Sequence, residues 1–171
     1  AMDALAQQTA QLINGKPLES DYFARQIAFN CIPQIDVFMD NDYTKEEMKM
    51  VWETQKIFGD PSIRVNATAV RVPVFYGHAE AVHIETQQPI AAEQAKELLR
   101  NAPGVVLFDA NEDYPTQVSH ATGHDEVFVG RVRNDISHPQ GLNLWVVADN
   151  VRKGAATNSI QIAEHLIKDY I

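Results

Sequence analysis

Cysteine is nearly absent from this sequence, since Cys31 is the only one among 171 residues. One thiol cannot form a disulfide within its own chain, and no basic stretch with an apolar centre precedes the first helical pattern. We therefore expect a protein of the reducing cytoplasm. Cys31 lies in the apolar stretch "FNCIP", without an adjacent cation or helix N-terminus to favour a thiolate, so we expect a small buried side chain there.

Long hydrophobic runs and basic clusters are missing too. Runs such as "GVVLF" and "LWVVA" are far shorter than the about twenty residues that a membrane span needs. The 14 Lys and Arg residues are outnumbered by 23 Asp and Glu, which gives a net charge of -9. No basic stretch matches a phosphate backbone. We therefore expect neither a membrane protein nor a nucleic-acid-binding one.

The hydrophobic pattern predicts alternating helices and strands. Helical spacing covers 1–13, 44–58 and 90–102, and the final segment 151–170 ends in a helix that carries Ile160, Ala163, Leu166 and Ile167 on one face. Strand-like runs cover 63–76, 81–87, 105–109, 125–133 and 141–150. The first two runs are separated by Gly77 and His78, which is consistent with adjacent strands. The segment 25–40 reads as extended with a bend at Pro33, and 111–125 reads as a polar loop.

This mixture predicts one α+β domain over residues 1–171, a length that buries roughly 70% of the surface of the unfolded chain. The sequence begins inside a helical pattern, without an opening strand. We interpret it as part of a longer protein.

The stretch "RVPVFYGHAEAVHIE" combines an apolar strand pattern with two side chains suited to chemistry. It begins with Arg71, and His78 follows Gly77. A histidine after a glycine at a strand end is more often a structural or surface residue. The alternative is a catalytic base, because such a position exposes the ring and the glycine leaves room for a substrate.

Three further groups are weaker candidates. Glu46 and Lys49 have the spacing of an ordinary exposed ion pair on a helix. His120 and His124 in "HATGH" are four residues apart, but Gly123 and the loop composition argue against a zinc-binding helix, so we expect no metal site. The segment around Asn158 mixes small residues with cations at a helix start, without the glycine spacing of a phosphate loop.

Five long stretches carry a family resemblance. They are "FNCIPQID", "TKEEMKMVWETQKI", "RVPVFYGHAEAVHIE", "DEVFVGRVR" and "GLNLWVVADNVRKGAATNSIQIAE". In this order and with these spacings they resemble the C-terminal half of bacterial aspartate-β-semialdehyde dehydrogenases, over nearly the whole chain. The resemblance implies a mixed, largely antiparallel sheet with helices packed mainly on one face, as in the C-terminal domain of glyceraldehyde-3-phosphate dehydrogenase.

The resemblance also implies an activity. The family enzyme uses NADPH to convert L-aspartyl 4-phosphate to L-aspartate 4-semialdehyde and phosphate, through a cysteine thioester, towards lysine, diaminopimelate, methionine and threonine. His78 matches its acid/base, Arg71 its α-carboxylate-binding residue and Glu46 its amino-group contact. Lys49 matches a cation near the phosphate, and Asn158 a contact to the nicotinamide end of NADP.

The family's nucleophilic cysteine, its phosphate-binding arginine and most of its NADP site lie N-terminal to the matched region. Cys31 does not match the nucleophile. We therefore expect a substrate-binding and dimerisation domain that forms a homodimer, with a tetramer as an alternative, and is inactive alone. Two rival readings are a reductase of another acyl phosphate, such as acetylated glutamyl phosphate, and a non-catalytic dimerisation module.

Overall fold

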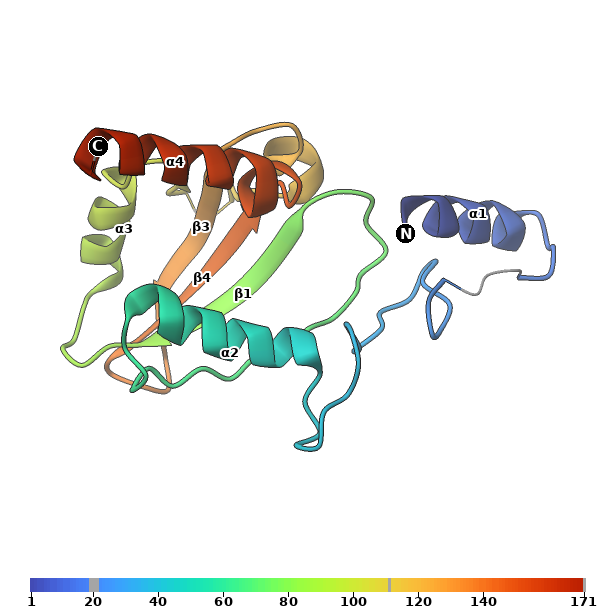
Figure 1. The fold of residues 1–171 in the computed structure, drawn as a ribbon, viewed down its shortest axis with the longest axis horizontal. Coiled ribbons are helices and arrows are strands. Elements are labelled where there is room, and N and C mark those ends of the chain that lie inside the picture. The colour runs from blue at the N-terminus through green and yellow to red at the C-terminus, as the bar shows by residue number, and fades with distance from the viewer. Residues whose placement is uncertain (19–21, 111, 171) are drawn as a thin grey trace. The chain divides into compact units, whose positions relative to one another are not determined.

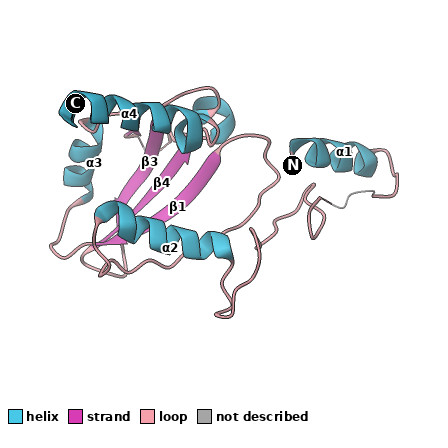
Figure 2. Ribbon diagram, viewed as in Figure 1, coloured by secondary structure: helices cyan, strands magenta, loops and turns pink. Residues whose placement is uncertain are grey.

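The computed structural model describes residues 1–18, 22–110 and 112–170 (Figures 1 and 2). The chain divides into two compact units, Ala1–Phe75 and Tyr76–Ile171. Each unit contains its own buried clusters of apolar side chains.

The first unit begins with helix α1, Met2–Ile13, as its apolar spacing predicts. Leu5 is buried against Ile27, Ala28 and Ile32. The buried amide of Gln8 also accepts hydrogen bonds from the backbone N–H groups of Ile27 and Ala28, at 2.9 and 3.2 Å. The helix is therefore tied to the following segment by both apolar and polar contacts.

Helix α2, Lys45–Phe58, confirms the second predicted helix. Thr44 and Glu47 form a capping box, in which the Thr44 N–H donates to Glu47 Oε2 at 2.7 Å and the Glu47 N–H donates to Thr44 Oγ1 at 3.4 Å. Gly59 ends the helix in the left-handed conformation, at φ 65°.

The predicted strand over 63–76 is wrong. Within this segment only Arg71 forms a β-bridge, with Ile32. The Val74 N–H donates to the Val72 carbonyl at 2.8 Å, which closes a tight turn around Pro73. Because proline fixes its φ and has no N–H to donate, the chain bends where the β-forming residues predicted a ladder.

The second unit is built on a four-stranded sheet in the order β1-β4-β3-β2. Its strands are β1, His78–Glu85; β2, Val105–Phe108; β3, Val127–Asn134; and β4, Gly141–Ala148. β4 pairs antiparallel with both β1 and β3, and β2 pairs parallel with β3. The α+β class and the mixed, largely antiparallel sheet are therefore confirmed. The expected pairing of β1 with the preceding segment is wrong, since β1 pairs with β4.

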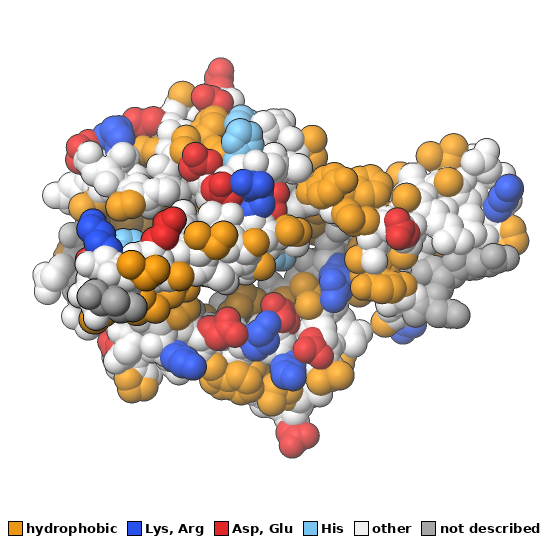
Figure 3. Space-filling model, turned by 45° about the horizontal axis from the view of Figure 1, so that its top comes forward, with side chains coloured by type: hydrophobic (Ala, Val, Ile, Leu, Met, Phe, Trp, Pro, Cys, Tyr) orange, Lys and Arg blue, Asp and Glu red, His pale blue; other side chains and the backbone are white. Residues whose placement is uncertain are grey.

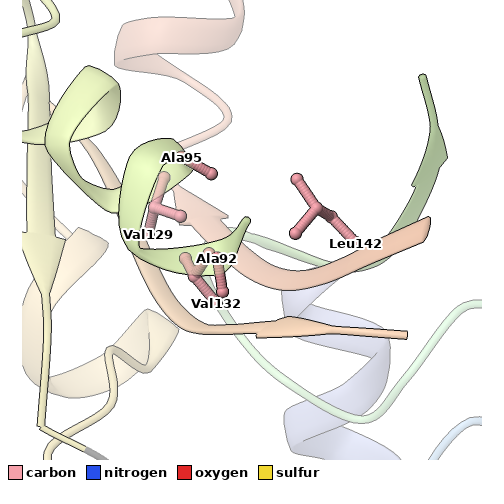
Figure 4. Close-up of a cluster of buried hydrophobic side chains, with 5 residues drawn as sticks. All are labelled: Ala92, Ala95, Val129, Val132 and Leu142. Carbon is pink, nitrogen blue, oxygen red and sulfur yellow. The ribbon is translucent and has the colours of Figure 1, made fainter. Parts of the chain in front are cut away.

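Helix α3, Ala92–Arg100, covers one face of this sheet. Ala92 and Ala95 point towards Val129 and Val132 of β3 and Leu142 of β4 (Figure 4). The two alanines allow the helix to approach the branched side chains of the strands closely.

The opposite face is covered by residues 115–124, for which we predicted a polar loop. That prediction is wrong in part, because Gln117–Ala121 form a single π-helical turn, η1. Ala121 is buried against Phe128 of β3 and Val147 of β4. The Trp145 indole N–H donates to the Pro115 carbonyl at 3.0 Å, which fixes the start of this segment to the sheet.

The chain ends in a π-helical turn, η2, Arg152–Ala156, followed by helix α4, Thr157–Tyr170. The predicted apolar face of α4 forms, but this chain does not bury it: Ile160 is 60% exposed, Leu166 49% and Ile167 63%. Among the described residues, no helix combines the length and apolarity that crossing a membrane would require.

Candidate functional site

The first group of candidate residues lies at the start of α2. Lys49 Nζ lies 3.0 Å from Glu46 Oε2, and their side chains are 42% and 36% exposed. The expected ion pair is therefore present, on a solvated helix face. The hydrogen bond to Glu46 is the main cause of a raised pKa at Lys49, and the charges of Glu53 and Asp36 add to it.

Glu47 connects this helix start to the chain segment that carries Arg71. Its buried carboxylate accepts the Thr44 N–H within the capping box and the Ala69 N–H at 2.8 Å. These backbone hydrogen bonds lower the pKa of Glu47, so it remains an anion and an acceptor. As a result Arg71, two residues after Ala69, is held at a defined place relative to Glu46 and Lys49.

Arg71 lines a cavity of about 250 Å³ in the first unit. Its backbone is fixed by two hydrogen bonds with Ile32, each of 2.9 Å. Its guanidinium carbon lies 5.5 Å from the centre of the Phe23 ring, within the range of a cation–π interaction. Among the described residues no carboxylate forms an ion pair with this guanidinium.

The sequence did not draw attention to Asp36 and Gln34, which also line this cavity. Asp36 adopts a left-handed backbone conformation, at φ 69°, and its side chain accepts the Val37 N–H at 2.8 Å. A non-glycine residue with positive φ in the stretch "PQIDVF" could not be recognised from composition. Only the folded structure identifies Asp36 as a candidate, because it places Asp36 in the lining of the cavity that also contains Arg71.

His78 belongs to the second unit and is the first residue of β1, opposite Ala148 of β4. We predicted that Gly77 and His78 separate two adjacent strands, but His78 is itself part of a strand. The turn is at Gly77, whose φ of 78° suits glycine. The His78 side chain is exposed, as proton transfer to a ligand would require.

Asn158 lies in the first turn of α4 and is exposed. The start of this helix is fixed by Asp125, whose two carboxylate oxygens accept hydrogen bonds from the Arg152 guanidinium at 2.7 and 2.8 Å. The Thr157 hydroxyl donates to the same carboxylate at 2.6 Å. Arg152 and then Thr157 lower the pKa of Asp125 to about 2.

The structure therefore places Glu46, Lys49 and Arg71 in the first unit, while His78 and Asn158 lie in the second. That both groups contribute to one site stays a prediction.

Cys31 is exposed, so the prediction of a buried thiol is wrong. The segment is extended, and its alternation buries the bridged Ile32 and leaves Cys31 on the solvent side.

The two histidines of "HATGH" pack against aromatic rings. His120 lies 4.8 Å from Phe108, and His124 lies 5.9 Å from Phe128, measured between ring centres. The Thr116 N–H donates to His120 Nδ1 at 3.1 Å. In the described parts of the chain, no group of three or more His, Cys, Asp or Glu residues could hold a metal ion.

Comparison with known proteins places this arrangement in a class of enzyme domains. The structure of aspartate semialdehyde dehydrogenase II complexed with ASA, from Vibrio cholerae, matches 99% of this chain and 50% of its own, with 69% identity and a TM-score of 0.96. Residues 1–153 match the family described as "Semialdehyde dehydrogenase, dimerisation domain". The chain belongs to this family.

Two other relatives define how far the similarity extends. Aspartate-semialdehyde dehydrogenase 2 of Vibrio cholerae serotype O1 is 70% identical over 169 residues, which are 99% of this chain and 50% of that protein. The structure of aspartate semialdehyde dehydrogenase with NADP from Candida albicans is 26% identical, with a TM-score of 0.64, over 82% of this chain and 45% of its own. The chain spans about half the length of the curated relatives it matches.

Proposed function

We propose that this chain is the substrate-binding and dimerisation half of an NADP-dependent aspartate-semialdehyde dehydrogenase in the cytoplasm. The reaction consumes L-aspartyl 4-phosphate, NADPH and a proton, and yields L-aspartate 4-semialdehyde, phosphate and NADP⁺. It would serve the biosynthesis of lysine, diaminopimelate, methionine and threonine. The proposal is carried by the 70% identity with the Vibrio cholerae enzyme across almost the entire chain.

In this proposal the first unit recognises the charged groups of the substrate. The planar guanidinium of Arg71 binds the α-carboxylate with two parallel hydrogen bonds. Glu46 meets the α-ammonium group and Lys49 the phosphate. The half-exposed Glu46–Lys49 pair supports this assignment, because surface ion pairs contribute at most about 1 kcal/mol and can exchange partners at little cost.

His78 would be the general acid/base. Its imidazole takes the proton of the attacking thiol and returns a proton to the tetrahedral adduct. The thiol, the phosphate-binding arginine and the dinucleotide fold belong, in this proposal, to the half of the enzyme outside the chain. NADPH supplies a hydride when bound. Asn158 would orient its nicotinamide carboxamide, and the anchored start of α4 supports that role.

The proposed assembly is a homodimer. It is supported by the family description, a dimerisation domain, and by the many large apolar side chains that remain exposed. Figure 3 shows such side chains, in orange, among charged ones on the molecular surface. Exposed apolar surface of this extent is typical of a region that a partner covers in the assembled protein.

The test is an assay of the full-length enzyme that contains this chain. We expect phosphate-dependent reduction of NADP with L-aspartate 4-semialdehyde as substrate, and much weaker activity with an N-acetylated glutamate semialdehyde. An acetylated amine is uncharged and cannot form an ion pair with Glu46. A preference for the acetylated substrate would favour the related reductase, and no activity with either substrate would favour a non-catalytic module.

A further inference from the structure

The side chain of Asn150 reaches the residue that precedes His78. Asn150 follows the end of β4, and its Oδ1 accepts the Gly77 N–H at 3.1 Å across 73 residues of sequence. This hydrogen bond joins the end of β4 to the start of β1, where the candidate acid/base stands.

The Gly77 backbone is confined on two other sides. A Cβ atom at this position would lie 3.0 Å from Gln117 Cβ and 3.2 Å from the Ala148 carbonyl oxygen. Its positive φ adds a conformation that other residues rarely adopt. The backbone direction at His78 therefore depends on the close packing around Gly77. The Asn150 carboxamide adds a hydrogen bond to the Gly77 N–H.

Asn150 is itself held by its neighbour Asp149. The buried carboxylate of Asp149 accepts the N–H groups of Gly123, Val151 and Arg152 at 2.8, 2.9 and 3.0 Å. These hydrogen bonds, that of Gly123 first, lower the pKa of Asp149 and keep it charged. The backbone around Asn150 is thus fixed without any contribution from the Asn150 side chain. This side chain is exposed and accepts the Gly77 N–H.

We propose that Asn150 is a positioning residue that holds the Gly77–His78 turn, and through it the imidazole, in the place from which His78 transfers protons. The inference rests on the proposed function of His78. Proton transfer requires the donor and acceptor to lie within hydrogen-bond reach, so a displacement of about 1 Å can cost on the order of 10²-fold in rate.

The first test uses single variants of the full-length enzyme. Asn150→Ala should lower kcat roughly 10- to 100-fold while the KM values for substrate and NADPH change little. Asn150→Asp keeps an accepting oxygen and should restore most of this loss. The matched control is Asn143→Ala, within the β4 strand that Asn150 follows. Asn143 Oδ1 faces a different imidazole, His83 Nδ1, at 3.4 Å, so kcat should stay near normal.

The second test is a double-mutant cycle with His78→Ala. If Asn150 acts through His78, adding Asn150→Ala to His78→Ala should cause no further loss of kcat. Additive losses, or a folded Asn150→Asp enzyme as slow as Asn150→Ala, would overturn the inference. A normal kcat for His78→Ala would instead reject the proposed role of His78, so the two failures are distinguishable.

Discussion

At the scale of single residues, His78 combines a fixed backbone with an exposed ring. Its main chain pairs with Ala148, and in the described parts of the chain its imidazole has no hydrogen-bond partner. His78→Ala in the full-length enzyme should therefore lower kcat by roughly 10² to 10⁴ with little change in KM. Steady-state kinetics with both substrates measure this, and a kcat near that of the unmodified enzyme would show that His78 is not the proton-transfer residue.

Arg71 is expected to act by geometry as well as by charge. Arg71→Lys keeps the charge but loses the planar pair of donors, so the KM for the amino-acid substrate should rise while the KM for NADPH stays constant. Arg64→Lys is a matched control, because Arg64 is exposed on the same segment and outside the cavity. A rise in the KM for NADPH instead would assign Arg71 to the cofactor site.

At the scale of elements, the start of α4 depends on one carboxylate. The folded-state pKa of Asp125 is about 2, against an ordinary value of 3.8. Its ionised form therefore contributes stability above about pH 4, and this contribution is lost as the pH falls towards 2. The Tm difference between the unmodified chain and Asp125→Asn should be largest above pH 4 and shrink as the pH approaches 2.

Asp113→Asn provides the control for this experiment. Asp113 is exposed and forms no ion pair with any described residue, so its substitution should give a Tm difference that does not change with pH in this way. If Asp125→Asn also gave a constant difference, the link between Asp125 ionisation and the fold would be absent.

Elements with local signals were predictable from the sequence. The capping box at Thr44 and Glu47 defined α2, and compact apolar runs defined β2, β3 and β4. The failures came from contacts that no local pattern reports. Residues 63–76 have strand-forming side chains, but Pro73 bends them away from a ladder. In η1, Ala121 is buried against the sheet, a contact that its polar surroundings in the sequence do not indicate.

The residues of the candidate site also fall into two groups, those that the sequence indicated and those that only the structure revealed. Glu46, Lys49, Arg71, His78 and Asn158 were selected by family resemblance, since their own spacings are ordinary. Asp36 could not be selected, because its place beside Arg71 joins residues 35 positions apart. The contact of Asn150 with Gly77 spans 73 residues. Contacts between residues so far apart in the sequence depend on the tertiary fold, and local sequence patterns do not report them.

At the scale of the whole molecule, two units with separate cores carry different parts of the proposed chemistry. The first holds the charged groups that we propose for substrate recognition, and the second holds the His78 imidazole and the start of α4. α4 has no buried residue in this chain. A partner that covers its exposed apolar side chains would add about 25 cal/mol of stability per Å² of apolar surface covered.

The last prediction concerns the purified 171-residue chain. It should be folded, because each unit has a buried apolar cluster, and dimeric, because burying exposed apolar side chains between two copies stabilises both. It should be inactive, since thioester chemistry needs a positioned thiolate and Cys31 does not match the nucleophile of the family. Light scattering and an NADPH-linked assay test these outcomes. A monomer would remove the dimer claim, and phosphate-dependent reduction of NADP that Cys31→Ser abolishes would identify Cys31 as the nucleophile after all.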